Sequence, residues 1–320
     1  MTSNLDEPQS TLDVSGRSDG TRSGYVTLVG RPNAGKSTLV NALVGQPLSI
    51  VTSKAQTTWE RVTAIDTYDH VQMIFLDTPG LLAPRDLLQR SMLAEALEAI
   101  READVVLAVV DASTATPADL SKLRDTLAES PAPRVVAVNK IDISEPYQVE
   151  AVSEWARTEL DSPSFAVSAA SSTGLAPLKT AVEEALPEGP FLFAPDDVAT
   201  RPTRFFVSEL VRETIFERFH QEIPYSVMCR VDEFREGQEP VYVGITIYVE
   251  KASQKPILIG GRGTAIKEVG RASREKIEHF LGRSVYLDLW VKVLPGWRRK
   301  RTHLARLGFH VPEGDDAERR

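Results

Sequence analysis

The chain has little cysteine and no long hydrophobic run. Its single cysteine, Cys229, cannot form an internal disulfide, which is typical of a reducing compartment. The longest apolar runs, such as Val105 to Val110, are far too short to cross a bilayer as a helix. The first twenty-odd residues are polar and lack the apolar core of a signal peptide. We therefore expect a cytoplasmic protein in which Cys229 is a small buried apolar residue.

The sequence also lacks internal repeats of a fixed period and low-complexity runs, which excludes a repeat array. What remains is ordinary globular material, with 42% hydrophobic and 26% charged residues. A length of 320 residues is long for one domain and comfortable for two.

The net charge of −8 is unevenly distributed along the chain. Residues 201–310 contain 20 Lys and Arg against 13 Asp and Glu, whereas the remainder contains 17 against 32. A basic module is thus joined to an acidic one. Basic segments often bind nucleic acid or anionic surfaces, although a mixed solvated surface would give the same count.

Hydrophobic patterning divides the chain into five parts. Residues 1–22 are polar and aperiodic, and we predict a disordered tail. In residues 23–187 strand patterns alternate with helix patterns, which predicts a mostly parallel sheet with helices on both faces. Residues 188–203 are rich in proline and predict a linker. Residues 204–303 predict the order α-β-β-α-α-β, and residues 304–320 a C-terminal tail.

The stretch GRPNAGKS, Gly30 to Ser37, matches the phosphate-loop pattern G-x-x-x-x-G-K-[ST] in full. It follows a predicted strand, Tyr25 to Val29, and precedes a predicted helix that begins at Thr38, which is the context this motif needs. Backbone N–H groups at such a turn can surround a pyrophosphate. Lys36 would reach the β- and γ-phosphates, and the Ser37 hydroxyl would bind Mg²⁺.

Two further motifs follow predicted strands, where open α/β sheets place their ligands. Asn139-Lys140-x-Asp142 offers a carboxylate that can accept two hydrogen bonds from guanine but not from adenine, which argues against an ATPase. The backbone of Ser168-Ala169-Ala170 could donate to the guanine oxygen, although this signal is weak.

The string Asp77-Thr78-Pro79-Gly80 also ends a strand. Its carboxylate suits Mg²⁺, and the Gly80 N–H could contact a γ-phosphate. From the irregular segment upstream, Thr58 rather than Thr57 could close over the same ion. The predicted metal ligands are therefore Ser37, Thr58 and Asp77.

In the second half, Gly260-Gly261-Arg262-Gly263 lies between two predicted helices. A G-x-x-G loop lets a nucleic-acid backbone approach and clamps about four nucleotides. In the following helix, Ile266, Val269, Ile277 and Phe280 form an apolar stripe, while three basic residues share another face. We expect Trp290 to be core, and Trp297 either to stack on a base or to pack against the linker. The predicted RNA-binding residues are Gly260, Gly261, Arg262, Gly263, Lys267, Arg271, Arg274, Arg298, Arg299, Lys300 and Arg301.

These motifs, in this order, resemble the Era family of GTPases. The resemblance is carried by GRPNAGKSTL, KAQTT at Lys54 to Thr58, DTPG followed by Leu81, and NKID. It extends into the second half through Pro224-Tyr225-Ser226-Val227, Ile259-Gly260-x-x-Gly263 and Leu289 to Val293, with Gly296-Trp297 after it. Trp59 departs from the family pattern, in which arginine is common after the threonine pair.

The resemblance implies a GTPase domain joined to a type II KH domain, with GTP or GDP and Mg²⁺ as ligands. It implies binding to the 3′ end of 16S rRNA and a role in assembly of the small ribosomal subunit. It also implies a cytoplasmic location with some peripheral association with the inner membrane, and we expect a monomer. The GTP-binding residues would be Gly30, Arg31, Pro32, Asn33, Ala34, Gly35, Lys36, Ser37, Thr38, Asp77, Thr78, Pro79, Gly80, Leu81, Asn139, Lys140, Asp142, Ser168, Ala169 and Ala170. The first switch would comprise Gln56, Thr57, Thr58, Trp59 and Glu60.

Hydrolysis poses a separate problem, because Leu81 occupies the position where Ras has a water-positioning glutamine. The resemblance implies that Asn33 helps to hold K⁺ in place of an arginine finger, so the catalytic residues would be Lys36, Asn33 and Thr58. Asn33 could also be an ordinary turn residue. A slow GTP-driven switch is the main hypothesis, and a nucleotide-sensing RNA chaperone with incidental hydrolysis is the alternative.

Overall fold

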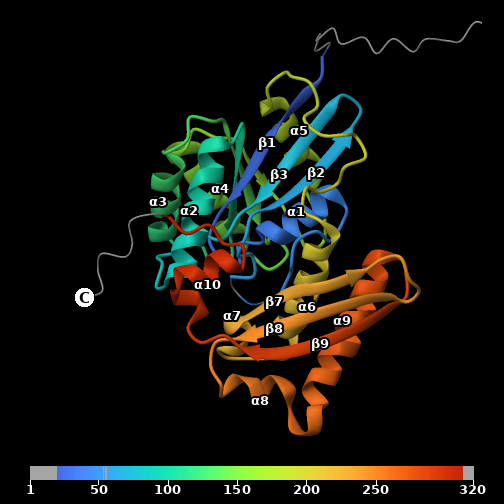
Figure 1. The fold of residues 1–320 in the computed structure, drawn as a ribbon. Helices are drawn as coiled ribbons and strands as arrows, with labels where there is room; N and C mark the ends of the chain where they lie inside the picture. Colours follow the sequence, from blue (N-terminus) through green and yellow to red (C-terminus); the bar gives the residue numbers. More distant parts are fainter. Residues whose placement is uncertain (1–19, 53, 55, 313–320) are drawn as a thin grey trace, which may run out of the picture.

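The computed structural model describes residues 20–52, 54 and 56–312. Of the predicted tails at residues 1–22 and 304–320, residues 1–19 and 313–320 lie outside this part. Figure 1 shows two α/β units, one above the other. The first contains a six-stranded sheet of order β2-β3-β1-β4-β5-β6, in which only β2 runs antiparallel to its neighbour. The strands are β1 (Arg22–Val29), β2 (Val62–Tyr68), β3 (Val71–Asp77), β4 (Val105–Asp111), β5 (Arg134–Asn139) and β6 (Ser164–Ala166).

Helices cover both faces of this sheet, as the alternating pattern predicted. On one face α1 (Lys36–Val44) and α5 (Leu175–Ala185) contribute Leu39, Val40, Leu178 and Val182 to a core that includes Val26. The other face is covered by α2 (Leu87–Glu102), α3 (Pro117–Leu127) and α4 (Pro146–Glu159). The central strands β4 and β5 are buried on both faces and are accordingly rich in Val.

The second unit consists of a three-stranded sheet covered by helices on one face. Its strands β7 (Val227–Arg235), β8 (Val241–Val249) and β9 (Val285–Val293) lie in that order, with β7 antiparallel and β9 parallel to β8. Its helices are α6 (Thr203–Arg218), α7 (Ile223–Ser226), α8 (Gln254–Ile259) and α9 (Thr264–Leu281), with a 3₁₀ turn, η1 (Gly261–Gly263), between the last two. The order α-β-β-α-α-β was predicted, apart from the short α7.

Alternation within these strands decides which side chains are buried. The aliphatic residues at odd positions of β8 and β9, such as Val243, Ile245 and Leu289, pack against α6 and α9. Even-numbered residues face away from the helices. Trp290 is one of these and is 61% exposed, so the prediction that it is core was wrong. The apolar stripe of α9 is confirmed, since Val269 and Ile277 are buried.

After β9 the chain returns to the first unit through η2 (Trp297–Arg299) and α10 (Arg301–Arg306). There it forms a cluster that joins both units, which we call the Trp59 cluster; it comprises Trp59, Leu88, Met92, Trp297, Leu304, Phe309 and Val311. Trp297 is fully buried and its indole N–H donates to the Ser226 carbonyl at 3.2 Å, which excludes base stacking. The domain limits proposed from the sequence stay a prediction.

Two expectations from composition can be compared with the structure: the burial of Cys229 and the absence of a membrane-spanning helix. Cys229 is 3% exposed within the core of the second unit, and burial raises the pKa of its thiol, as expected for an inert apolar residue. Within residues 20–52, 54 and 56–312, none of the helices combines the length and apolarity that crossing a bilayer requires.

Candidate functional site

The phosphate loop contains two residues with positive φ, a backbone conformation that few residue types adopt easily. Gly35, which precedes α1, has φ of +95°, and a Cβ there would meet the Asn139 side-chain nitrogen at 2.2 Å. Asn33 also has positive φ, 65°, a conformation that Asn tolerates better than most residues. The loop therefore turns sharply and presents its amides at the N-terminus of α1, where an anion is favoured.

Lys36 of this loop is buried near Asp77, the last residue of β3. Lys36 is 6% exposed, and its Nζ lies 3.3 Å from the carbonyl oxygens of Gly30 and Arg31. Burial lowers the pKa of Lys36, and the Asp77 charge opposes that shift. Burial likewise raises the pKa of Asp77, and Lys36 opposes it. Each ion thus needs the other, or an incoming ligand, to remain charged.

Three oxygen ligands converge beside Lys36. The Ser37 hydroxyl donates to Asp77 Oδ2 at 2.7 Å, and Thr58 Oγ1 lies 3.0 Å from Ser37 Oγ and 3.4 Å from Asp77 Oδ2. Asp77 Oδ1 is buried and has no hydrogen-bond partner among the described residues. An orphaned carboxylate oxygen beside two hydroxyls suits a hard divalent cation such as Mg²⁺. All three predicted metal ligands are brought together, and Ser37 and Thr58 line a cavity of about 260 Å³ with the phosphate loop.

The base side of the site is organised by Asn139 at the end of β5. Its Nδ2 donates to the Ala34 carbonyl at 2.9 Å, and its Oδ1 accepts from the Ala169 N–H at 3.0 Å. Asn139 thereby ties the phosphate loop to the loop after β6. The Ala169 amide is therefore already used within the protein.

Lys140 and Asp142 follow Asn139 on the same loop. Lys140 has φ of 67° and its Nζ forms an ion pair with Asp111 at 2.7 Å. Burial would raise the pKa of Asp111, but hydrogen bonds from Lys140 and Ser113 outweigh it, and the pKa is lowered. Asp142 is exposed, so its carboxylate is accessible to a base.

Leu81 does not point a polar group at this cavity. Its backbone N–H donates to the Gly30 carbonyl at 3.1 Å, and its side chain packs against the core under α3. Gly80 lies against the phosphate loop, because a Cβ there would meet Pro32 N at 2.6 Å. Gly80 and Leu81 can therefore present backbone amides to a phosphate, but neither has a side chain that can polarise water.

The first switch is held by residues of the second unit. Arg212 of α6 is 1% exposed; it donates to the Thr57 carbonyl and pairs with Glu209 at 2.6 Å. Its guanidinium lies 4.6 Å from the Trp59 ring centroid. Lys54 donates to the carbonyls of Phe216 and Phe219, the latter at 2.7 Å, at the C-terminal end of α6. Thr58 is thus positioned from both units.

The G-x-x-G turn separates α8 from α9, as predicted. Gly260, Arg262 and Gly263 have positive φ of 75°, 52° and 78°. Gly261 does not, and an added Cβ there would meet no described atom within 4 Å. Beside the turn, α9 and β9 form a groove of about 440 Å³, lined by Ile266, Lys267, Gly270, Arg271, Arg274, Val285, Tyr286, Leu287 and Leu289. Three of the predicted RNA-binding cations line it.

The second basic cluster is divided by the structure. Arg298 pairs with Asp86, the N-cap of α2, at 2.5 Å, and Arg301 donates to the carbonyls of Val311 and Pro312 at 2.8 and 2.6 Å. Both stabilise the return of the chain to the first unit. Only Arg299 and Lys300 of this cluster are exposed.

Sequence reasoning missed the residues that join the two units. The spacing of Arg212 gave only a weak indication of its role. It shares a helical face with Ser208 and Phe216, which are buried, and an arginine on a buried face needs an interaction partner. Lys54 was singled out only as part of a string. Tyr286, in the groove, was not singled out at all.

Most of the chain is similar to known proteins. Residues 25–140 match the sequence family described as 50S ribosome-binding GTPase, and residues 222–298 match the KH domain family. GTPase Era of Carboxydothermus hydrogenoformans is 41% identical over 291 residues, which cover 90% of this chain and 98% of that protein. GTPase Era of Synechocystis sp. is 39% identical over 297 residues, which cover 92% of this chain and 94% of that protein.

Two solved structures have the same two-unit architecture. One is a point variant of Aquifex aeolicus Era bound to GDP and AlF4⁻. The other is Era in complex with MgGDPNP and nucleotides 1506–1542 of 16S ribosomal RNA. Each has a TM-score of 0.86 and 35% identity, and covers 91% of this chain and 100% of the solved chain.

Proposed function

The chain belongs to the Era family of GTPases, and on that basis we propose that it is a GTP-driven switch that binds the 3′ end of 16S rRNA during assembly of the small ribosomal subunit. The observation that carries the proposal is the first switch itself. Thr58 lies in the cation site of the GTPase domain, while its neighbours Thr57 and Trp59 contact Arg212 of the KH domain. A change at the nucleotide can therefore reach the domain that carries the RNA groove.

Nucleotide binding is assigned to the residues predicted from the sequence. The loop amides and Lys36 would hold the β- and γ-phosphates, and Asp142 would select guanine. Ser37, Thr58 and Asp77 would hold Mg²⁺, which orients the phosphates and neutralises the charge that develops between them. These residues would bind and orient the nucleotide.

Hydrolysis is expected to be slow, since Leu81 offers no group that positions water. We assign Asn33 to K⁺ binding, supported by its positive φ at the cavity that the phosphate loop lines. The intrinsic rate would then depend on the monovalent cation. The rival hypothesis, an RNA chaperone with incidental hydrolysis, predicts no RNA-dependent change in turnover.

The small subunit is the partner that the comparisons favour. The family described as 50S ribosome-binding GTPase matches only the first unit, whereas the solved Era complex with 16S rRNA matches both. The groove beside the G-x-x-G turn supplies the cations and the open backbone that single-stranded RNA needs. Cytoplasmic location, peripheral membrane association and a monomeric state stay predictions.

A substitution at Gly261 tests the RNA assignment. Gly261→Asp adds a side chain and a negative charge where we place an RNA phosphate, and the local geometry accommodates it without a clash among described atoms. We expect a large loss of affinity for an oligonucleotide that matches the 16S 3′ end, with GTP affinity unchanged. The salt slope should also fall by about 0.7 for each phosphate that the variant no longer binds.

The matched control is Gly237→Asp, in the turn between β7 and β8. It adds the same charge to the same domain, again with nothing described within 4 Å of the new Cβ. It should bind RNA as the unaltered protein does. Intact RNA binding by folded Gly261→Asp would place the RNA site elsewhere, with Arg299 and Lys300 as the next candidates.

A further inference from the structure

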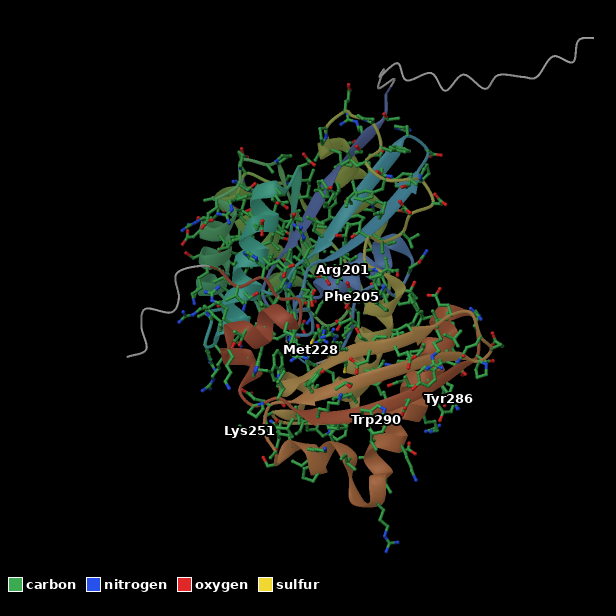
Figure 2. The ribbon with its side chains drawn as sticks, in the orientation of Figure 1. Arg201, Phe205, Met228, Lys251, Tyr286 and Trp290 are labelled. Carbon is green, nitrogen blue, oxygen red and sulfur yellow. The ribbon has the colours of Figure 1, made fainter. Side chains whose placement is uncertain are left out.

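The face of the KH sheet opposite its helices is uncovered along β9, where Tyr286 and Trp290 are exposed, whereas Thr246 of β8 is buried. It carries the even-numbered residues of β8 and β9. Strand register places Tyr242 opposite Tyr286, Gly244 opposite Asp288, and Thr246 opposite Trp290. Tyr286 and Trp290 are 60% and 61% exposed, and Figure 2 shows both along β9.

The aromatic rings on this face are fixed in position. The rings of Tyr242 and Tyr286 stack with centroids 5.8 Å apart and an interplanar angle of 15°. Asp288 accepts from the Trp290 indole N–H at 3.0 Å and from the Tyr242 hydroxyl at 3.3 Å. The Tyr242 ring leans over Gly244, whose missing side chain leaves it room; a Cβ there would lie 3.4 Å from the ring. One carboxylate thus holds an aromatic side chain on either side of it.

Cations flank these rings. Arg235 lies over Tyr242, 4.8 Å from the ring centroid. Arg230 is paired in register with Thr246, which is itself paired with Trp290, and Lys292 is two residues from Trp290 on β9. Both are exposed, and neither forms an ion pair within the described part of the chain. Aromatic faces with unpaired cations beside them suit stacked bases and nearby phosphates.

This face is continuous with the proposed RNA groove. Strand β9 is an edge strand, so its odd residues Leu287 and Leu289 line the groove while its even residues lie on the uncovered face. Tyr286 belongs to both, because it lines the groove and stacks on Tyr242. A strand of RNA leaving the groove therefore has a continuous path around β9.

We propose that the uncovered face, made by Tyr242, Tyr286, Trp290, Arg230 and Lys292, is a second RNA site that stacks unpaired bases of a strand leaving the G-x-x-G groove. The proposal rests on the proposed RNA-binding function and extends it. Tyr286 and Trp290 are four residues apart, about 13 Å along a strand, which separates two stacking positions. The site would add affinity with little sequence preference, since every base has a face that can stack.

The test uses the full chain and two RNA probes. The long probe spans nucleotides 1506–1542 of 16S rRNA. The short competitor is a single strand of about four nucleotides, enough for the G-x-x-G clamp alone. Trp290→Ala should weaken binding of the long probe about 5- to 150-fold, the range for removing one base–aromatic stack. It should leave the short competitor and GTP unaffected.

Three further variants sharpen the result. Trp290→Phe keeps an aromatic face and should recover most of the affinity. Tyr147→Ala removes another exposed aromatic ring, 72% exposed on α4 of the GTPase domain, and should change nothing. Arg230→Ala with Lys292→Ala should lower the salt slope of the long probe by about 0.7 per phosphate contact, whereas Trp290→Ala should leave that slope unchanged.

Unchanged affinity of Trp290→Ala for the long probe would overturn the second RNA site. This is also the result expected if the face binds a protein and not RNA. Equal losses for both probes would also overturn it, because Trp290 would then support the groove itself. Failure of the whole RNA assignment gives a different pattern, in which Gly261→Asp also binds the long probe normally.

Discussion

Replacing Arg212 should separate GTP binding from GDP binding. Arg212 is buried in α6, yet it contacts the first switch through the Thr57 carbonyl and the Trp59 ring. The switch residue Thr58 is expected to meet the cation and γ-phosphate only when GTP is bound. Removing the support that Arg212 gives this segment should therefore weaken GTP and leave GDP nearly unaffected.

The size of the effect follows from these interactions. A hydrogen bond from a charged donor is worth about 1.5–3 kcal/mol. A cation–π contact at a buried site adds up to about 2 kcal/mol. Because some of this energy is also available to the GDP state, we expect Arg212→Lys to lower GTP affinity roughly tenfold to a hundredfold, at about 1.4 kcal/mol per factor of ten. Lysine keeps the charge but lacks the planar fork that pairs with Glu209.

The assay is titration of both nucleotides in Mg²⁺, with the free energy of unfolding measured by urea on the same samples. Arg212→Met would remove one partner of a buried pair and cost about 3–5 kcal/mol, so lysine is the preferred variant. Leu258→Ala is the control, because it opens a cavity in the KH core at a cost of about 2–5 kcal/mol without touching the switch. Equal losses for GTP and GDP, or a GTP-selective loss in Leu258→Ala, would refute the assignment.

Three other outcomes are expected from the same structure. Asp142→Asn should weaken GTP and favour xanthosine triphosphate, each charge-assisted hydrogen bond that is removed costing about 1.5–3 kcal/mol; an unchanged preference for GTP in competition binding would contradict the base assignment. Hydrolysis should be faster in K⁺ than in Na⁺ at equal ionic strength, and Asn33→Ala should abolish the difference, so equal phosphate-release rates in the unaltered protein would exclude the K⁺ site. Burial raises the pKa of Glu95, so the folded state binds its proton more tightly than the unfolded chain and stability falls as pH rises through the folded pKa. Glu95→Gln should flatten that fall in urea titrations across the pH range in which it occurs, and parallel curves would show that Glu95 is not its source.

The strands, helices and nucleotide motifs were accessible from sequence because each depends on local spacing. The phosphate loop is one example, since Gly35 and Asn33 occupy positions whose backbone few residues tolerate. Trp290 shows where such reasoning fails. Trp290 was assigned to the core because it was taken to alternate with polar residues, but its direct neighbours Leu289 and Val291 are apolar, and the polar residues are on its own face. The five aliphatic residues from Val285 to Val293 would have identified the inner face.

The contacts between the two units join residues that are far apart in the sequence, so no local spacing pattern predicts them. The segment from Leu304 to Val311 is too short to show a helical period, and its partners Trp59, Leu88 and Met92 lie more than two hundred residues earlier. Arg298 illustrates the same limit. A run of four basic residues predicts a solvated or RNA-binding surface, and only the fold reveals that one of them pairs with Asp86.

The Trp59 cluster also means that the two halves are not separable modules. A chain that stopped at the linker would leave Trp59, Leu88 and Met92 without their covering residues, as one contiguous apolar patch beside the first switch. Patches of this kind cause self-association. A truncated GTPase fragment would then be poorly soluble, and its nucleotide kinetics would describe a switch that has lost its support. Measurements on the intact chain and on such a fragment should therefore not be treated as interchangeable.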